Sequence, residues 1–248
     1  MGYNDEFENG SRSNQLEHTR YFSRQRITAS DLSQDQNYYR EKQRMHNRLL
    51  HGWGIVCGLE VTPAPTQEAP LNIRIGRGYA LSAPGDDLYV HADILFDLAK
   101  SIAGPKKEDC SRPCSPSVAG HVDPEDPFYL VIKYAECPAR PVKVPPVGCG
   151  CDDTACEYSR IRDSFEISCL AQLPNSHIPP ASNMPSVCEV VSSKVVSCPS
   201  PPEDPWIVLA KITIPDSGNL TTNDIDPLVR RILLSSAILQ EELRTLCE

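Results

Sequence analysis

The sequence lacks the features that would point to a membrane or a nucleic acid. No apolar run approaches the roughly 18 residues that a membrane-spanning helix needs, and the first 15 residues, MGYNDEFENGSRSNQ, lack the apolar core of a signal peptide. Lys and Arg total 24 against 33 Asp and Glu, which gives a formal net charge of −9 without any basic run. Nucleic-acid binding needs cationic side chains that displace counterions from phosphates. We therefore predict a protein without a membrane span or a nucleic-acid partner, made in the cytoplasm and not exported by the Sec route.

The motifs of the common enzyme classes are missing as well. The chain has no G-x-S-x-G nucleophile elbow, no phosphate-binding glycine loop and no H-E-x-x-H zinc helix. Gly76-Arg77-Gly78 is too short for a dinucleotide-binding fingerprint and predicts a bulge or a tight turn. None of the six histidines forms an i, i+4 pair, and His46 is interpreted as a hydrogen-bonded core residue. We therefore predict that the protein is not an enzyme and assign no catalytic or cofactor-binding residue.

Proline and cysteine are the two residue types in excess, with 23 and 11 among 248 residues. Residues 104–205 hold 17 of the prolines and nine of the cysteines, which predicts long loops that cysteine chemistry would order. Four thiolates within 20 residues would suit a tetrahedral structural zinc ion, and they are Cys137, Cys149, Cys151 and Cys156. The spacing is not that of paired C-x-x-C motifs, so disulfides and free thiols stay open as alternatives. Further partners for disulfides are Cys110, Cys114, Cys188 and Cys198.

Three cysteines lie apart from this cluster. Cys57 and Cys169 fall within strand-like runs and are interpreted as small core residues. Because the cysteine count is odd, at least one thiol lacks a partner within the chain. Cys247, near the end of the sequence, is the candidate for that thiol.

Hydrophobic periodicity predicts a helix near each end of the chain and strands between them. Ser30 would cap a helix over residues 31–50, with Leu32, Tyr39 and Leu49 on one apolar stripe. From residue 55 to 100, short apolar runs separated by Gly, Pro and Asp predict a meander of antiparallel strands, followed by strands at 128–136, 164–173 and 206–214. Asp226 would begin a second helix that runs to residue 246.

These elements predict an α+β fold, with an antiparallel β-sheet or sandwich core, an N-terminal helix, a C-terminal helix and long Cys/Pro-rich loops. Residues 1–20 would be a flexible arm, and residues 21–103 would hold the N-terminal helix and the β-meander. Residues 104–215 would add strands with Cys/Pro-rich insertions to the same core, and residues 216–248 would hold the C-terminal helix.

The predicted C-terminal helix carries a heptad pattern. Apolar residues spaced alternately by four and three positions would form a seam that only Ser236 interrupts; they are Ile225, Val229, Ile232, Leu239, Leu243 and Leu246. One interpretation is that the seam pairs with another copy and makes a homo-oligomer. The other is that the helix packs on the chain's own sheet, because Leu228, Leu233 and Leu234 widen its apolar face.

Four stretches of the chain form a distinctive set: residues 21–61, which contain the block HGWGIVCGL, and residues 73–90, 158–167 and 205–214. In this order they resemble proteins encoded with phage-tail-like contractile injection systems, and the N-terminal segments of some phage tail and baseplate proteins. The resemblance implies a structural or adaptor subunit at or near the baseplate that binds other subunits of the particle, without an active site. From these 248 residues we expect no fibre or receptor-binding part like those of longer tail proteins. The chain's place in the particle therefore stays open, as does whether that particle is released or anchored at a membrane.

Two alternative functions remain beside this one. The chain would be a cargo or effector carried by the particle, or a carbohydrate-binding β-sandwich. For the second alternative, Trp53 or Trp206 would be the stacking platform. Trp53, between two glycines, is interpreted instead as filling the corner between the first helix and the first strand.

Overall fold

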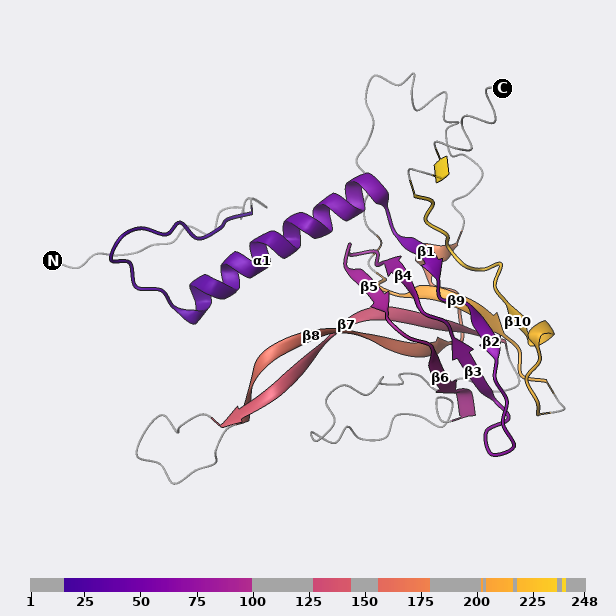
Figure 1. Cartoon of the computed structure of the whole chain (residues 1–248). Coiled ribbons are helices and arrows are strands. Elements are labelled where there is room, and N and C mark those ends of the chain that lie inside the picture. Colours follow the sequence, from indigo (N-terminus) through magenta and orange to yellow (C-terminus); the bar gives the residue numbers. More distant parts are fainter. Residues whose placement is uncertain are drawn as a thin grey trace, which may run out of the picture.

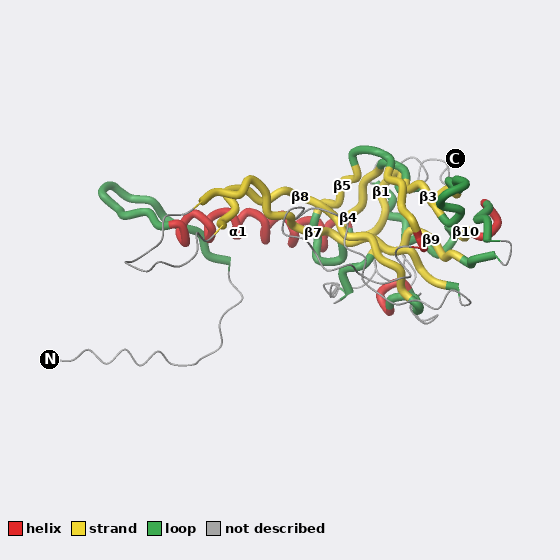
Figure 2. Tube along the Cα trace, turned by 90° about the horizontal axis from the view of Figure 1, so that it is seen from below, coloured by secondary structure: helices red, strands yellow, loops and turns green. Residues whose placement is uncertain are grey.

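The structure is a computed structural model that describes residues 16–99, 127–143, 156–178, 202, 204–215, 218–235 and 238–239. It has a β-rich body from which a long helix and the outer part of a β-hairpin project to the same side (Figure 1). Seen from below, these two elements extend together beyond the body (Figure 2). No helix in the described part of the chain is long and apolar enough to cross a membrane.

The long helix confirms the predicted helix over residues 31–50, although it begins two residues earlier. Ser30, predicted as the N-cap, therefore lies within its first turn. In α1 (Ala29–His46) the N-cap is Thr28, which forms a capping box with Asp31: each side chain accepts a hydrogen bond from the other residue's backbone N–H. Such a cap stabilises a helix by about 1 kcal/mol. The helix continues as a π-helical turn, η1 (Asn47–His51), and Gly52 ends it with a φ of 82°.

The prediction that an apolar stripe of this helix faces the core is wrong. Leu32, Tyr39 and Leu49 are 52, 64 and 45% exposed, and α1 contributes no buried residue. His46, interpreted as a core histidine, is exposed as well. The physical reason is that α1 leaves the body instead of covering a sheet face (Figure 1).

The first six strands form two three-stranded antiparallel sheets, which confirms the predicted antiparallel strands. One sheet has the order β1 (Gly54–Gly58), β4 (Gly78–Leu81), β5 (Asp87–Val90). The other has the order β2 (Val61–Pro63), β3 (Asn72–Ile75), β6 (Ile94–Asp97). Every ladder within them is antiparallel. The predicted meander order is wrong, because β1 pairs with β4 and β3 pairs with β6 instead of each strand pairing with the next.

A third sheet has four strands in the order β10 (Ile225–Asp226), β9 (Ile207–Ile212), β7 (Phe128–Lys143), β8 (Cys156–Leu170). β7 and β8 are longer than the predicted strands at 128–136 and 164–173, because Pro138 and Pro141 do not end β7. Both prolines lie beyond Ile132, where the pairing of β7 with β9 ends and only β8 remains as its partner. A strand with one free edge tolerates the missing N–H of proline.

One cluster of buried side chains, contributed by all three sheets, forms the core. β9 is buried on both faces over residues 207–210 and on one face after that, as its sequence pattern predicted. Burial of each large aliphatic or aromatic side chain stabilises the fold by about 1.5–3 kcal/mol. The fully buried members with the largest side chains include Ile73, Ile75, Leu88, Phe128, Leu130, Ile132 and Ile167. The antiparallel β-core with an N-terminal helix is therefore the part of the predicted α+β fold that is confirmed.

The predicted C-terminal helix is wrong over residues 226–235. Ile225 and Asp226 form β10 and pair with β9, and the chain then turns and runs along β1. Ile55 donates its N–H to Arg231 O and accepts a hydrogen bond from Leu233 N–H, both at 2.8 Å. These backbone groups are therefore bonded to the edge of β1 and not to a helical ladder. Residues 236–237 and 240–248 lie outside the described residues, as do most of the predicted Cys/Pro-rich loops, at 100–126, 144–155 and 179–201.

Candidate functional site: the projecting arm

The arm is the part of the molecule that projects from the β-rich body. We define it as residues 16–51 together with the outer part of the β7–β8 hairpin, residues 136–143 and 156–163 (Figure 2). The helix of the arm can form because the sequence before residue 51 contains a long stretch without Gly or Pro. The hairpin of the arm is held together by the continuous ladder of backbone pairs between β7 and β8. The hairpin reaches past Ile207, the last residue of β9 that pairs with β7.

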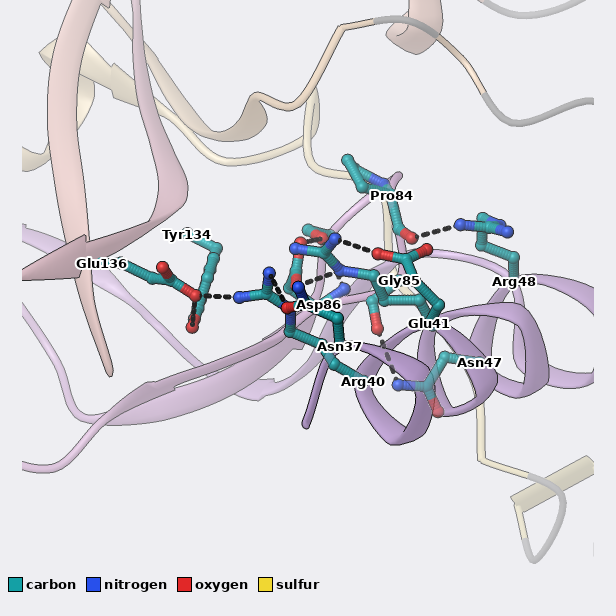
Figure 3. Close-up of polar contacts among 12 residues, drawn as sticks. Asn37, Arg40, Glu41, Asn47, Arg48, Pro84, Gly85, Asp86, Tyr134 and Glu136 are labelled. Atoms are coloured by element: carbon teal, nitrogen blue, oxygen red, sulfur yellow. Dashed lines mark hydrogen bonds and ion pairs between the residues drawn. The ribbon is translucent and has the colours of Figure 1, made fainter. Parts of the chain in front are cut away.

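The C-terminal half of the helix is bonded to the turn between β4 and β5 (Figure 3). Three side chains donate to three consecutive residues of this turn: Arg48 to Pro84 O at 2.8 Å, Asn47 to Gly85 O at 2.8 Å, and Arg44 to the Asp86 carboxylate at 2.6 Å. Asn47 is buried, and an unsatisfied buried donor would cost about 1–3 kcal/mol. A side chain at Gly85 would lie 2.4 Å from Arg44 O. The helix and the turn therefore meet backbone against backbone.

A second contact joins the helix to the hairpin. Arg40 forms an ion pair with Glu136 (Figure 3). On the same part of the ladder, the Tyr134 hydroxyl donates to the Asp163 carboxylate at 2.7 Å. Burial, together with Asp163, raises the pKa of Tyr134, so the hydroxyl keeps its proton. An exposed ion pair contributes less than about 1 kcal/mol. Among the described residues, nothing N-terminal to Arg40 forms a hydrogen bond or ion pair with the body.

Exposed apolar side chains are concentrated on the arm. Of the 20 large hydrophobic residues that are exposed among the described residues, 12 belong to it. Single exposed hydrophobic residues are ordinary, whereas a concentration of them marks an interaction surface. The 12 are Leu16, Tyr21, Phe22, Ile27, Leu32, Tyr39, Met45, Leu49, Leu50, Val142, Tyr158 and Ile161.

The block HGWGIVCGL forms the junction between the arm and the body. Trp53 is 9% exposed, with the His177 ring edge-on at 4.8 Å and the Arg231 guanidinium over its face at 4.4 Å. The interpretation of Trp53 as a corner residue is confirmed, and burial removes it as a sugar-stacking platform. Gly54 is required because its φ is 140° and a side chain there would lie 2.7 Å from Arg231 O. The other tryptophan, Trp206, is half-buried and is covered by an ammonium group at 4.4 Å, that of Lys133.

The histidine at this junction predicts a pH-dependent stability. Burial lowers the pKa of His177 to about 4, and its Nε2 accepts a hydrogen bond from Val208 N–H at 3.1 Å. The unfolded chain binds a proton with a pKa near 6.5, so it binds more protons than the folded chain between these values. We expect the free energy of unfolding to fall as the pH drops from about 6.5 to 4, on the order of 1–2 kcal/mol at a half-buried site.

Urea unfolding between pH 4 and 7 tests this expectation, with His177→Gln as the control. The glutamine amide oxygen still accepts a hydrogen bond but does not titrate. The pH dependence should be shallower in the variant. Equal pH dependence in the two proteins would contradict the role of His177.

A polar pocket of about 390 Å³ lies on the body, apart from the arm. Its lining residues are Gly58, Glu60, Thr62, Arg74, Gly76, Arg77 and Asp93. Thr62 and Arg74 are cross-strand partners, so the outward face of the β2–β3 ladder forms part of the wall. Two guanidinium groups and two carboxylates leave the lining without a net formal charge.

The structure tests the predicted cysteine cluster at one residue. Cys137 is buried and disulfide-bonded, which matches the disulfide alternative for this residue. Cys149 and Cys151 lie outside the described residues, and only the backbone of Cys156 is described. Within the described part of the chain, no three His, Cys, Asp or Glu residues are grouped so as to hold a metal ion. A disulfide-bonded Cys137 is not a thiolate ligand, so zinc binding by all four cysteines requires reduction of this disulfide and stays a prediction.

The two cysteines interpreted as core residues differ from each other. Cys169 is buried, as predicted, whereas Cys57 is exposed, so that interpretation is wrong. A register shift between Ile55 and Cys57 in the β1–β4 ladder explains the difference. An extra residue in one strand reverses which side chains face the core.

The predicted C-terminal seam is divided among different environments. Ile225 is buried in β10, Val229 is half-buried, and Ile232 is 54% exposed beside β1. Leu239 is 45% exposed, whereas Leu243 and Leu246 lie outside the described residues. Ile225 and Ile232 therefore do not lie on one face of a helix. Homo-oligomer formation stays a prediction, but Ile225 and Ile232 no longer support it.

Comparison with known proteins gives no family. No protein-family model and no curated protein matches the chain. Among solved structures, the chain is similar to one described as the crystal structure of TssK, with a TM-score of 0.37 and 9% sequence identity. The match covers 86% of this chain and 41% of that one, so the chain spans less than half the length of its structural neighbour. A TM-score this low carries no argument about function.

Proposed function

We propose that the protein is a structural or adaptor subunit of a phage-tail-like contractile injection particle, at or near the baseplate, where it acts by binding other subunits. The sequence resemblance given above supports this proposal. Its most specific block, HGWGIVCGL, is the segment that joins the arm to the body. The subunit acts within an assembled particle and performs no catalytic step.

The observation that carries the proposal is the exposure of the arm. An isolated polar helix of 18 residues is marginally stable in water, and helices in proteins gain most of their stability from packing. In the single chain, α1 contains no buried residue, and 12 large hydrophobic side chains of the arm are exposed to solvent. Packing against another subunit would cover these side chains and stabilise the helix. A sugar-binding role lacks comparable support because Trp53 is buried and the Lys133 ammonium group lies over the ring of Trp206.

Mass spectrometry of purified particles tests the proposal. We expect the chain in a fixed copy number that is a multiple of the baseplate symmetry, because a structural subunit occupies equivalent positions. The amount of a cytoplasmic enzyme from the same cells, measured in the same particle preparation, serves as the control for contamination. Variable, substoichiometric amounts of the chain, with particles that assemble normally without it, would favour the cargo alternative and contradict a structural role.

A further inference from the structure

The far end of the arm carries a structured basic segment, residues 16–28, which we call the tip. The tip folds back along the N-terminal half of α1 (Figure 1). The Thr19 hydroxyl donates to Asp31 O at 3.0 Å, and the His18 and Tyr38 rings lie 4.8 Å apart. These contacts hold the tip against the helix but bury almost none of its side chains.

The tip combines cationic and apolar side chains in one short run. The run is RYFSRQRI, and all three of its arginines are exposed without a hydrogen bond or ion pair to any described residue: Arg20, Arg24 and Arg26. Between and after them, Tyr21, Phe22 and Ile27 are 46, 65 and 55% exposed. Arginine and aromatic residues are the types enriched in the buried centres of protein interfaces.

Charge indicates the kind of surface that the tip would meet. The three arginines stand against one carboxylate in the tip, that of Glu17, whereas the whole chain has a formal net charge of −9. A guanidinium group binds a carboxylate through paired hydrogen bonds, so an acidic protein surface is the complement. An extended polyanion such as nucleic acid would meet the repulsion of the acidic body. The pocket on a second copy has no net charge to attract the tip.

We propose that the tip docks into an acidic groove on a different subunit of the particle. The three arginines pair with carboxylates at the rim of the groove, and Tyr21 and Phe22 enter its centre. This inference rests on the proposed function and names the docking element and the chemistry of its partner. It also explains why α1 extends from the body: the helix carries the tip to a neighbouring subunit.

Incorporation of variants into particles tests the docking. The full chain carrying Arg20→Glu, Arg24→Glu and Arg26→Glu is produced in cells that lack the original chain, and its amount per particle is measured by mass spectrometry. We expect a loss of about tenfold or more, because like charges placed together in an interface cost several kcal/mol. The matched variant with lysine at the same three positions keeps the charge and should be incorporated far better. Arg74→Glu with Arg77→Glu, on the body, should leave incorporation unchanged.

A photo-crosslinking residue at position 22 identifies the partner. Capture of a carboxylate-rich stretch of a different particle subunit supports the proposal, whereas capture of a second copy, of lipid or of nucleic acid, or no capture, overturns it. Incorporation of the glutamate variant at the wild-type level also overturns it. Failure of the proposed function gives a different result: the unaltered chain is then not found in particles at a fixed copy number. Circular dichroism of the purified variants confirms that each one is folded.

Discussion

Replacing Gly85 with alanine is expected to release the arm from the body. Gly85 has a φ of 100°, and a side chain there would lie 2.4 Å from Arg44 O and 2.9 Å from Arg44 Cα. These are backbone atoms of α1, so the clash is relieved only if the helix moves away from the turn. The move would break the bonds of Asn47 and Arg44 to that turn. With the backbone strain added, we expect a cost of about 3 kcal/mol or more for docking of the helix.

Hydrogen exchange of the amides at the C-terminal end of α1 and in η1 measures this release, because the bonds to the turn hold that end of the helix. We expect protection to be lost there while β7 and β9 keep theirs. The control is Gly218→Ala, because Gly218 also has a positive φ, 73°, but a side chain there meets nothing within 4 Å. Gly218→Ala carries the conformational cost without the clash. Wild-type protection of α1 in Gly85→Ala would contradict the backbone contact between the helix and the turn.

The elements that the sequence predicted well are those whose signals are local. The helix over 31–50 contains no Gly or Pro and has glycines just past its end. β9 has an apolar run on both faces followed by alternation, which matches its burial. In both cases the residues that determine the element lie within it or next to it. Long-range contacts were not needed to find them.

The position of the helix could not be predicted in the same way. Periodicity shows that Leu32 and Tyr39 share a face, but it does not show what that face contacts. Low overall hydrophobicity was the available signal, because α1 is polar around most of its circumference and a sheet-covering helix needs a broad apolar face. Asn47, one of the side chains that fix the helix to the turn, has no sequence signature, since its partner is a backbone carbonyl 38 residues away.

The C-terminal segment was mispredicted because two patterns fit the same residues. Ile225 belongs to a heptad spacing, but it is also the apolar residue of a short strand that pairs with Ile212. Intrinsic helix signals such as Pro227 are weak beside the free edge of β1, which offers hydrogen-bonding groups to a passing chain. The glycine at position 54, which permits this approach, was the sequence feature that could have indicated it.

Replacing Leu233 with proline is therefore expected to destabilise the body. We call residues 230–233 the C-terminal strap. Proline at 233 removes the N–H that donates to Ile55 O at 2.8 Å and leaves that carbonyl without this partner in a buried residue. Displacement of the strap would also withdraw Arg231 from the face of Trp53. We expect a loss on the order of 2–4 kcal/mol in the free energy of unfolding, measured by urea titration.

The matched control for the strap is Leu234→Pro. Leu234 is 47% exposed, and its N–H makes no hydrogen bond within the described part of the chain. Its replacement changes the same kind of residue at the next position without removing a bond to β1, so the loss should be well under half of that for Leu233→Pro. Comparable losses in the two variants would mean that stiffening of the segment matters and the bond to Ile55 does not. A difference in the expected direction would show that the backbone bond to Ile55 holds the segment against β1.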